Sequence, residues 1–232
     1  MTTALTESIS PAEAIAARLI DTGCVSLRRE EPYRLPSGWA SPGYMDCRRL
    51  ISFPTLRKDL VDQGIELLRS KSALDGVASI AGGEASGIAL AAWMAQALDL
   101  PLQYVRKRAV GTSLVEGILE RGARVLLVDD MMAAGASKAR FVRTLRDAGA
   151  SVRDVFVVFD YGTFETRQIF EPMGLRVHAL ATWRDVLAVA RRRGDFAVAS
   201  LTELEAFLNH PSDWSLAHGG RGSVATPESV IS

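Results

Sequence analysis

Short apolar runs alternate with helix-forming segments from Val77 onward, and this alternation constrains the fold more than any other feature. The clearest run, residues 125–128, is apolar throughout, which is typical of a strand buried on both faces of a parallel sheet. Further strands are expected at 77–80, 102–105, 155–159 and 175–180, and helices at 86–98 and 164–171 and before Ala148. Repeated βαβ units predict an α/β fold, a central parallel sheet flanked by helices.

The residues before Val77 predict a helix, a hairpin and a second helix. Ser10 and Glu13 can form a capping box around a helix that Gly23 ends. The turn-rich stretch 27–41 predicts a short hairpin, and a helix is expected over 54–70. Two closing helices are expected at 183–192 and 201–208. These patterns divide the chain into an N-terminal extension (1–75), an α/β core (76–220) and a disordered tail (221–232).

Composition and charge exclude several classes of protein. The 27 basic and 27 acidic residues give no net charge to attract nucleic acid or an anionic membrane. The most apolar stretch, 88–98, is far shorter than the roughly 20 residues that span a bilayer, and the N-terminus lacks the pattern of a secretory signal. Cys24 and Cys47 fit buried thiols in a reducing compartment, and the three histidines lack metal-ligand spacing. We therefore expect a soluble cytoplasmic protein.

The segment 125–137 carries the strongest chemical signal. Asp129 and Asp130 follow a buried strand, at the edge where ligands of open α/β sheets bind. The next small residues, Ala133, Ala134, Gly135, Ala136 and Ser137, allow backbone N–H groups to reach a phosphate at a helix N-terminus. Carboxylates accept hydrogen bonds from sugar hydroxyls, so the segment indicates a sugar-phosphate site. The alternative is an acidic strand-to-helix turn that binds nothing.

A second glycine-rich turn spans 81–87, and its Gly82 and Gly83 could let the backbone wrap a diphosphate. The basic run Arg106-Lys107-Arg108 follows the next strand. Together these features favour a ligand with a phosphate at one end and a diphosphate at the other. Glycine-rich βα turns are common, however, and the basic run could be a solvated loop.

Several segments resemble one family. The acidic turn resembles the phosphoribosyl-diphosphate (PRPP) motif of type I phosphoribosyltransferases. Others resemble the orotate phosphoribosyltransferases in particular, and the resemblance extends from about Thr22 to Gly220. They are Ser-Pro-Gly-Tyr-Met-Asp-Cys-Arg-Arg-Leu-Ile-Ser-Phe-Pro (41–54), Gly-Gly-Glu-Ala-Ser-Gly-Ile (82–88), Tyr-Val-Arg-Lys (104–107), Val-Glu-Gly (115–117), Ala-Thr-Trp-Arg-Asp-Val-Leu-Ala (181–188) and the stretch 207–214.

The resemblance implies a type I phosphoribosyltransferase fold with an N-terminal helix and hairpin forming a hood on the base side. It also implies transfer of 5-phosphoribosyl from PRPP to orotate, giving orotidine monophosphate and diphosphate in pyrimidine nucleotide biosynthesis. Such enzymes use Mg²⁺, which is expected to bind mainly through PRPP without side-chain ligands. They act as homodimers in which a mobile loop reaches the neighbouring site.

By position, the resemblance assigns roles to individual residues. Asp129 and Asp130 would bind the ribose hydroxyls, residues 133–137 the 5-phosphate, and Arg106 and Lys107 the diphosphate. Lys107, Arg106 and Asp130 would be the catalytic residues. Tyr44, Ser37 and Tyr161 would border the base.

Five positions depart from the family pattern. Val110 stands where the family has a loop lysine, and the loop is about three residues shorter. Ala133 and Ala134 replace threonines, and Pro36 stands where a lysine is frequent. Tyr161 stands where many members carry an arginine for the orotate carboxylate. These changes leave two alternatives to an active orotate enzyme: a paralogue that binds PRPP or a nucleotide as a regulator, and a transferase for a different base.

The loop position provides a direct test. If the chain is a regulator, we expect Val110→Lys to create orotate-dependent diphosphate release that the parent lacks, because a lysine ammonium neutralises the departing diphosphate. Steady-state rates of the parent and the variant measure the change. An unchanged rate would contradict the idea that the loss of this lysine limits catalysis.

Overall fold

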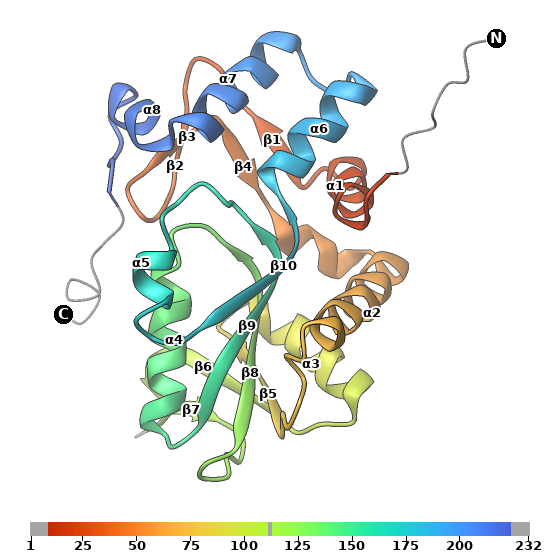
Figure 1. The fold of residues 1–232 in the computed structure, drawn as a ribbon, viewed down its shortest axis with the longest axis vertical. Helices are drawn as coiled ribbons and strands as arrows, with labels where there is room; N and C mark the ends of the chain where they lie inside the picture. Colours follow the sequence, from red (N-terminus) through yellow and green to blue (C-terminus); the bar gives the residue numbers. More distant parts are fainter. Residues whose placement is uncertain (1–8, 111–112, 224–232) are drawn as a thin grey trace.

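A six-stranded sheet forms the centre of the molecule in a computed structural model that describes residues 9–110 and 113–223 (Figure 1). The strand order is β10-β9-β8-β5-β6-β7, and all neighbours are parallel except β6 and β7. This arrangement confirms the predicted α/β fold. The strands are β5 (Ser79–Gly83), β6 (Leu102–Val110), β7 (Ser113–Glu116), β8 (Arg124–Met132), β9 (Ser151–Asp160) and β10 (Arg176–Thr182).

Helices cover both faces of this sheet. On one side lie α2 (Pro54–Ser70) and α3 (Ser86–Leu98), and on the other α4 (Ala136–Asp147) and α5 (Arg167–Phe170) (Figure 1). Each face has its own apolar core. Phe156 packs in the core on the α2 side, which continues beyond the sheet, whereas Phe141 packs in the core on the α4 side.

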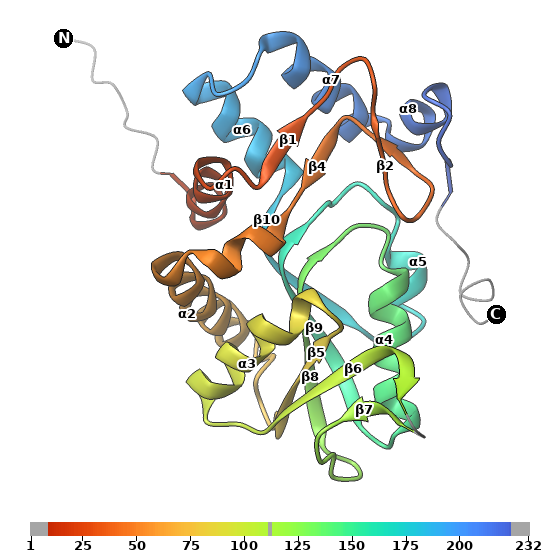
Figure 2. The ribbon, with the colours of Figure 1, turned by 180° about the vertical axis from the view of Figure 1, so that it is seen from behind.

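A smaller layer, here called the hood, sits over the carboxyl ends of the strands (Figure 2). It is built from both ends of the chain, because α1 packs against α6 and α8 packs against β3. Ion pairs join Arg192 to Glu13 and Arg193 to Asp21. Its elements are α1 (Pro11–Asp21), β1 (Val25–Leu27), β2 (Tyr33–Arg34), β3 (Ala40–Ser41), β4 (Gly43–Met45), α6 (Trp183–Arg193), α7 (Val198–Asn209) and α8 (Pro211–Ala217). The short 3₁₀ helix η1 (Cys47–Ser52) leads from the hood to α2.

The chain after α8 holds the hairpin of β2 and β3. The N–H of Arg221 donates to the carbonyl of Gly38 at 2.9 Å, and the Trp39 indole N–H donates to the carbonyl of Ser223 at 3.1 Å. The prediction of a disordered tail from residue 221 is therefore wrong for residues 221–223, because Arg221 and Ser223 hydrogen bond to the hairpin. The rest of the expected tail lies outside the described residues, and the division into domains at 75 and 220 stays a prediction.

Local sequence signals placed most helices well. The helices predicted from 54 to 70 and from 86 to 98 have those bounds, and α1 begins with the predicted capping box of Ser10 and Glu13. The basic run 106–108 is strand, however, and not the expected loop, because β6 continues and pairs with β7. Neither β7 nor α8 was predicted. In the described part of the chain, no helix is both long and apolar enough to cross a membrane.

A buried carboxylate ties three strands together at the amino edge of the sheet. Asp154 in β9 is 2% exposed and bonds to Arg124 of β8 and to Arg176 and His178 of β10, at 2.8 to 3.0 Å. Burial by itself raises the pKa of Asp154, but these three hydrogen bonds outweigh it and lower that pKa below its usual value. The carboxylate therefore stabilises the fold in its charged form.

We expect Asp154→Asn to lower the free energy of unfolding by about 3 kcal/mol, because removing one partner leaves buried charge uncompensated. The folded-state pKa lies below the unfolded value, so this contribution is present above about pH 4 and is lost as the pH falls through the folded pKa. Urea unfolding at several pH values measures it. Equal stability of parent and variant at pH 7 would contradict the assignment.

Candidate active site

The turn between β8 and α4 places acidic side chains and a helix N-terminus at one spot. Gly135 is the N-cap of α4 and has a φ of 80°, a left-handed conformation that favours glycine. A Cβ atom there would also lie 2.8 Å from the ring of Phe170. Glycine therefore lets the turn stay tight, so that the first N–H groups of α4 face the carboxyl end of β8.

Asp129 is the last of five consecutive buried residues in β8, and both of its carboxylate oxygens accept from donors. Its Oδ2 lies 2.6 Å from Nζ of Lys138, and its Oδ1 accepts from the Asp130 N–H at 2.9 Å and from the Ser86 hydroxyl at 3.4 Å. Asp129 is 3% exposed and Lys138 6%. The ion pair is thus largely shielded from water.

Asp130 is the outer carboxyl group of the pair. Its Oδ1 accepts from the Ser86 hydroxyl at 3.0 Å and from the Met131 N–H at 2.7 Å. Burial, with the nearby charge of Asp129, raises the pKa of Asp130 to about 6, against a smaller lowering by Lys138. Asp130 is therefore a carboxyl group that gains or loses its proton close to physiological pH.

The glycine-rich segment at the end of β5 permits close packing. A Cβ on Gly87 would lie 2.7 Å from the Val128 carbonyl oxygen, and one on Gly83 would lie 2.5 Å from the ring of Phe141. Gly82 is similarly close to Ile88. Gly82 and Gly83 are buried strand residues, so the predicted turn that would wrap a diphosphate begins only after Gly83. Their tight packing brings α3, and with it Ser86, against the end of β8.

The two catalytic basic residues expected from the sequence lie differently. The N–H of Lys107 donates to the Glu84 carboxylate at 2.6 Å, and Lys107 lines the same cavity as the acidic pair. Arg106 instead pairs with Glu116 of β7 at 2.7 Å and is not among the residues that line the cavity. The alternating directions of side chains along β6 separate the two neighbours.

The hood, with η1 and the residue that follows β9, supplies aromatic and hydroxyl groups. The rings of Tyr44 and Tyr33 lie 5.2 Å apart, and Arg48 donates to the Tyr44 hydroxyl at 3.1 Å. Tyr161 is 1% exposed, and burial raises the pKa of its phenol. The hydroxyl oxygen of Ser37 is buried and has no hydrogen-bond partner among the described residues.

Most of the groups described above line one cavity of about 480 Å³. All sequence-predicted site residues line it except Arg106, Gly82 and Gly83. The lining residues are Leu35, Pro36, Ser37, Tyr44, Met45, Asp46, Cys47, Arg48, Glu84, Ser86, Lys107, Asp129, Asp130, Met131, Ala133, Ala134, Gly135, Ala136, Ser137, Lys138, Phe141 and Tyr161.

Sequence reasoning missed five polar residues of this cavity: Asp46, Arg48, Glu84, Ser86 and Lys138. Ser86 and Arg48 belong to segments that were recognised, but nothing local indicates which way they point. Lys138 directly follows residues 133–137, and a lysine in the first turn of a helix that begins beside two aspartates was a signal available in the sequence. Among the described residues, no three His, Cys, Asp or Glu side chains gather in a way that could hold a metal ion.

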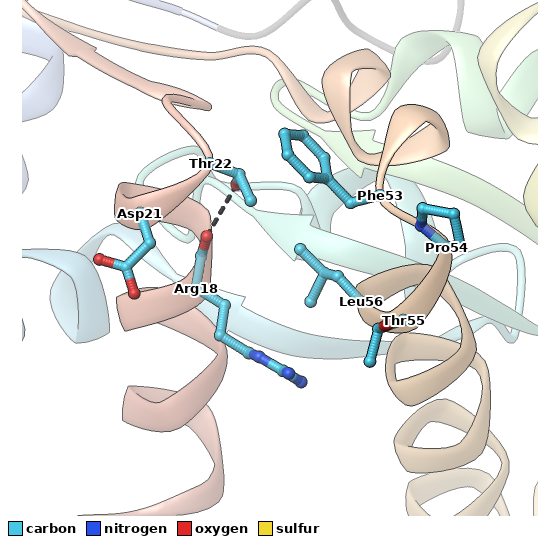
Figure 3. A pocket seen from close by; sticks show the side chains of 7 residues that line it. All are labelled: Arg18, Asp21, Thr22, Phe53, Pro54, Thr55 and Leu56. Carbon is cyan, nitrogen blue, oxygen red and sulfur yellow. Dashed lines mark hydrogen bonds between the residues drawn. The ribbon is translucent and has the colours of Figure 1, made fainter.

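A second, smaller depression lies between α1 and the start of α2 (Figure 3). Its volume is about 290 Å³, and its walls include Arg18 and Thr22 on one side and Phe53 and Leu56 on the other. The Thr22 hydroxyl donates to the Arg18 carbonyl at 2.7 Å, and Arg18 also pairs with Asp59. None of the predicted site residues lies here.

Comparison with known proteins identifies the family. Residues 77–167 match the family described as "Phosphoribosyl transferase domain". The chain is 41% identical over 226 residues to the orotate phosphoribosyltransferase of Rhizobium meliloti, covering 96% of this chain and 97% of that protein. It is 44% identical over 216 residues to that of Cereibacter sphaeroides, covering 89% and 93%. The crystal structure of orotate phosphoribosyltransferase from Aeropyrum pernix superposes with a TM-score of 0.65 at 30% identity, covering 78% of this chain and 99% of that one.

Identity at this level over nearly the whole of both chains agrees with the motifs found in the sequence and with the placement of the acidic turn in the fold. The chain belongs to the orotate phosphoribosyltransferase family of transferases.

Proposed function

We propose that this protein transfers the 5-phosphoribosyl group of PRPP to orotate, giving orotidine monophosphate and diphosphate. The observation that carries the proposal is that the acidic pair, the N-terminus of α4 and Lys107 face one cavity. The N–H groups of a helix N-terminus bind a phosphate, carboxylates accept hydrogen bonds from ribose hydroxyls, and a lysine ammonium pairs with the negative charge of a diphosphate. The full-length identity to orotate phosphoribosyltransferases supports the same reaction.

In this reaction the bond between ribose C1′ and the diphosphate oxygen breaks, and a bond from C1′ to a ring nitrogen of the base forms. Because charge develops on the leaving diphosphate and on the ribose, catalysis depends on placed charges and on orientation. Residues 133–137 would hold the 5-phosphate with backbone N–H groups, and Lys107 would meet the diphosphate. Asp130 would accept from the ribose hydroxyls, which requires its ionised form.

The hood would hold the base. Ser37 offers a buried hydroxyl without a partner in the described chain, which fits a polar ligand, since such groups rarely stay unpaired. Tyr44 offers an aromatic wall, and Tyr161 closes the cavity from β9's side. This pocket has no arginine at position 161, but the guanidinium of Arg48 lines the cavity and suits a carboxylate.

Mg²⁺ is the cofactor that we propose. The cavity suits an ion that enters with its substrate, because Mg²⁺ binds substrate phosphates while keeping several of its waters. Among the described residues, no three His, Cys, Asp or Glu side chains gather to hold it without substrate, so the ion would be held mainly through PRPP. When bound, the ion would supply positive charge at the diphosphate.

We also propose a cytoplasmic homodimer. Another cavity, of about 430 Å³, adjoins the active-site cavity. The residues that line both are Cys47, Arg48, Ser86, Lys107 and Asp130. Its walls include Trp93 and the half-exposed Ile51. Apolar surface beside an active site is typical of a subunit interface. The buried, free Cys24 and Cys47 are compatible with a reducing compartment.

The decisive experiment incubates purified protein with PRPP, Mg²⁺ and orotate and follows orotidine monophosphate by chromatography, with calorimetric titration of PRPP on the same sample. We expect turnover of order 1 s⁻¹ or faster. Binding of PRPP without product would point to a regulator or to another base. A chain that binds no PRPP would overturn the proposal.

Two substitutions test the proposed roles. We expect Asp130→Asn to lower kcat/KM by about 100-fold or more, and Lys107→Ala by about 10- to 100-fold, because each removes charge-assisted contacts to substrate. Arg106→Ala, in the neighbouring residue outside the cavity, should have a smaller effect. Steady-state kinetics of the four proteins measure this, and equal losses for Lys107→Ala and Arg106→Ala would contradict it.

The dimer has its own test. Sedimentation equilibrium should give a mass about twice the 25.1 kDa of one chain. Ile51→Glu should shift the protein toward monomer, since a charge at the centre of an apolar interface is costly to bury. Val198→Glu, at an 80% exposed position on α7, is the control and should leave the mass unchanged. A monomeric parent protein would refute the proposed dimer.

A further inference from the structure

Lys138 is a buried cation next to the acidic pair. It lies in the first turn of α4, is 6% exposed, and places Nζ 2.6 Å from Oδ2 of Asp129. Lysine is seldom buried this far unless it is paired. Both members of the pair line the active-site cavity, so their charge faces the space where substrate is proposed to bind.

The two carboxyl groups differ in how their oxygens are used. Both oxygens of Asp129 are occupied, Oδ2 by Lys138 and Oδ1 by the Asp130 N–H, and the Ser86 hydroxyl, whose one proton lies closer to Asp130, is 3.4 Å from Oδ1. The hydrogen bonds found for Asp130 in the described chain all reach Oδ1, from Ser86 and the Met131 N–H. Asp130 therefore keeps an oxygen with capacity to accept from a ligand.

We propose that Lys138 is a positioning residue. Its ion pair holds the Asp129 carboxylate in place, and Asp130 is left as the carboxylate that accepts hydrogen bonds from the ribose hydroxyls. The proposal rests on the proposed sugar-phosphate substrate, and it divides between two residues a role that the family resemblance gives to both. The ammonium of Lys138 also offsets the charge of Asp129, and this weakens the electrostatic repulsion between the two neighbouring carboxyl groups in their partly buried site.

Lys138 also acts on Asp130 through charge. The groups that face Asp130 are Asp129 and Lys138 beside it, and Cys47 and Arg48 from η1. Lys107 and Glu84 lie farther along the same cavity wall. Without the ammonium, Asp129 would still repel a negative Asp130, and the proton on Asp130 would be held more tightly. Asp130 would then be protonated at higher pH and unable to accept from two hydroxyls.

The test uses Lys138→Met, which removes the charge, Lys138→Arg, which keeps it, and the double variant Lys138→Met with Asp129→Asn, which removes both charges. The first readout is the ¹³C shift of the Asp130 carboxyl group as a function of pH in the ligand-free protein. The second is the pH profile of kcat/KM, with KM for PRPP. Lys58 of α2 provides the matched control, because Lys58→Met breaks a pair with Asp62 of the same 2.6 Å length at the exposed surface.

We expect the Asp130 titration to move upward by about one pH unit in Lys138→Met, and the acidic limb of kcat/KM to move with it, with about a fivefold loss near pH 6. Lys58→Met should behave as the parent, and Lys138→Arg, which keeps the positive charge, should keep the Asp130 titration at the parent position. The double variant should return the Asp130 titration toward the parent position, although Asp129→Asn will itself impair the site. If Lys138→Met does not fold, Lys138→Gln, which can still donate to Asp129, replaces it.

An Asp130 titration that is the same in Lys138→Met and Lys58→Met would overturn the proposal. A higher KM for PRPP with no change in either pH profile would also overturn it, since this would mean that Lys138 binds substrate directly. If the parent protein makes no orotidine monophosphate, the proposed function fails, but the carboxyl titration in the ligand-free protein still decides the role of Lys138.

Discussion

The Asp129 carboxylate is buried in the carboxyl-terminal half of β8, and the geometry of the site depends on how that charge is satisfied. Its donors come from α3, from α4 and from its own strand: Ser86, Lys138 and the N–H of Asp130. An isolated carboxylate at this depth would be strongly unfavourable. The same contacts that satisfy it therefore hold two helix N-termini against the end of β8, where α4 presents its N–H groups.

A related arrangement occurs at the opposite edge of the sheet. There Asp154 is buried among Arg124, Arg176 and His178 and ties three adjacent strands together. The two clusters differ in their access to the cavity. Asp154 lies away from the proposed substrate, whereas the pair of Asp129 and Lys138 lines it. The buried charges at the amino edge of the sheet thus stabilise the fold, whereas the charged groups at the carboxyl edge line the cavity in which substrate is proposed to bind.

The hood depends on contacts between distant parts of the chain. The hairpin of β2 and β3 has two residues in each strand, and short isolated hairpins are marginally stable in water. Ser215 of α8 accepts from the Ala40 N–H at 2.9 Å and donates to the Arg221 carbonyl at 2.6 Å. The end of the chain therefore holds in place the segment that carries Ser37.

Much of the fold and part of the site could be predicted from the sequence, because helix caps, apolar periodicity and the acidic turn are local signals. They were sufficient for the parallel sheet, for the bounds of α2 and α3, and for the acidic pair. Pairing between segments was not predictable in this way. The edge strand β7 forms because β6 offers it unpaired backbone groups, and α8 is a short helix that packs on the hairpin.

The sequence by itself determined the α/β class, the order of most of the elements and the position of the acidic pair just before a helix. Only the tertiary structure decided that Lys107 faces the cavity while Arg106 turns to Glu116, and that Lys138 neutralises Asp129. The reason is physical. Helix and strand signals arise between residues a few positions apart, whereas the direction of a side chain and the partner of a buried charge depend on which elements pack together.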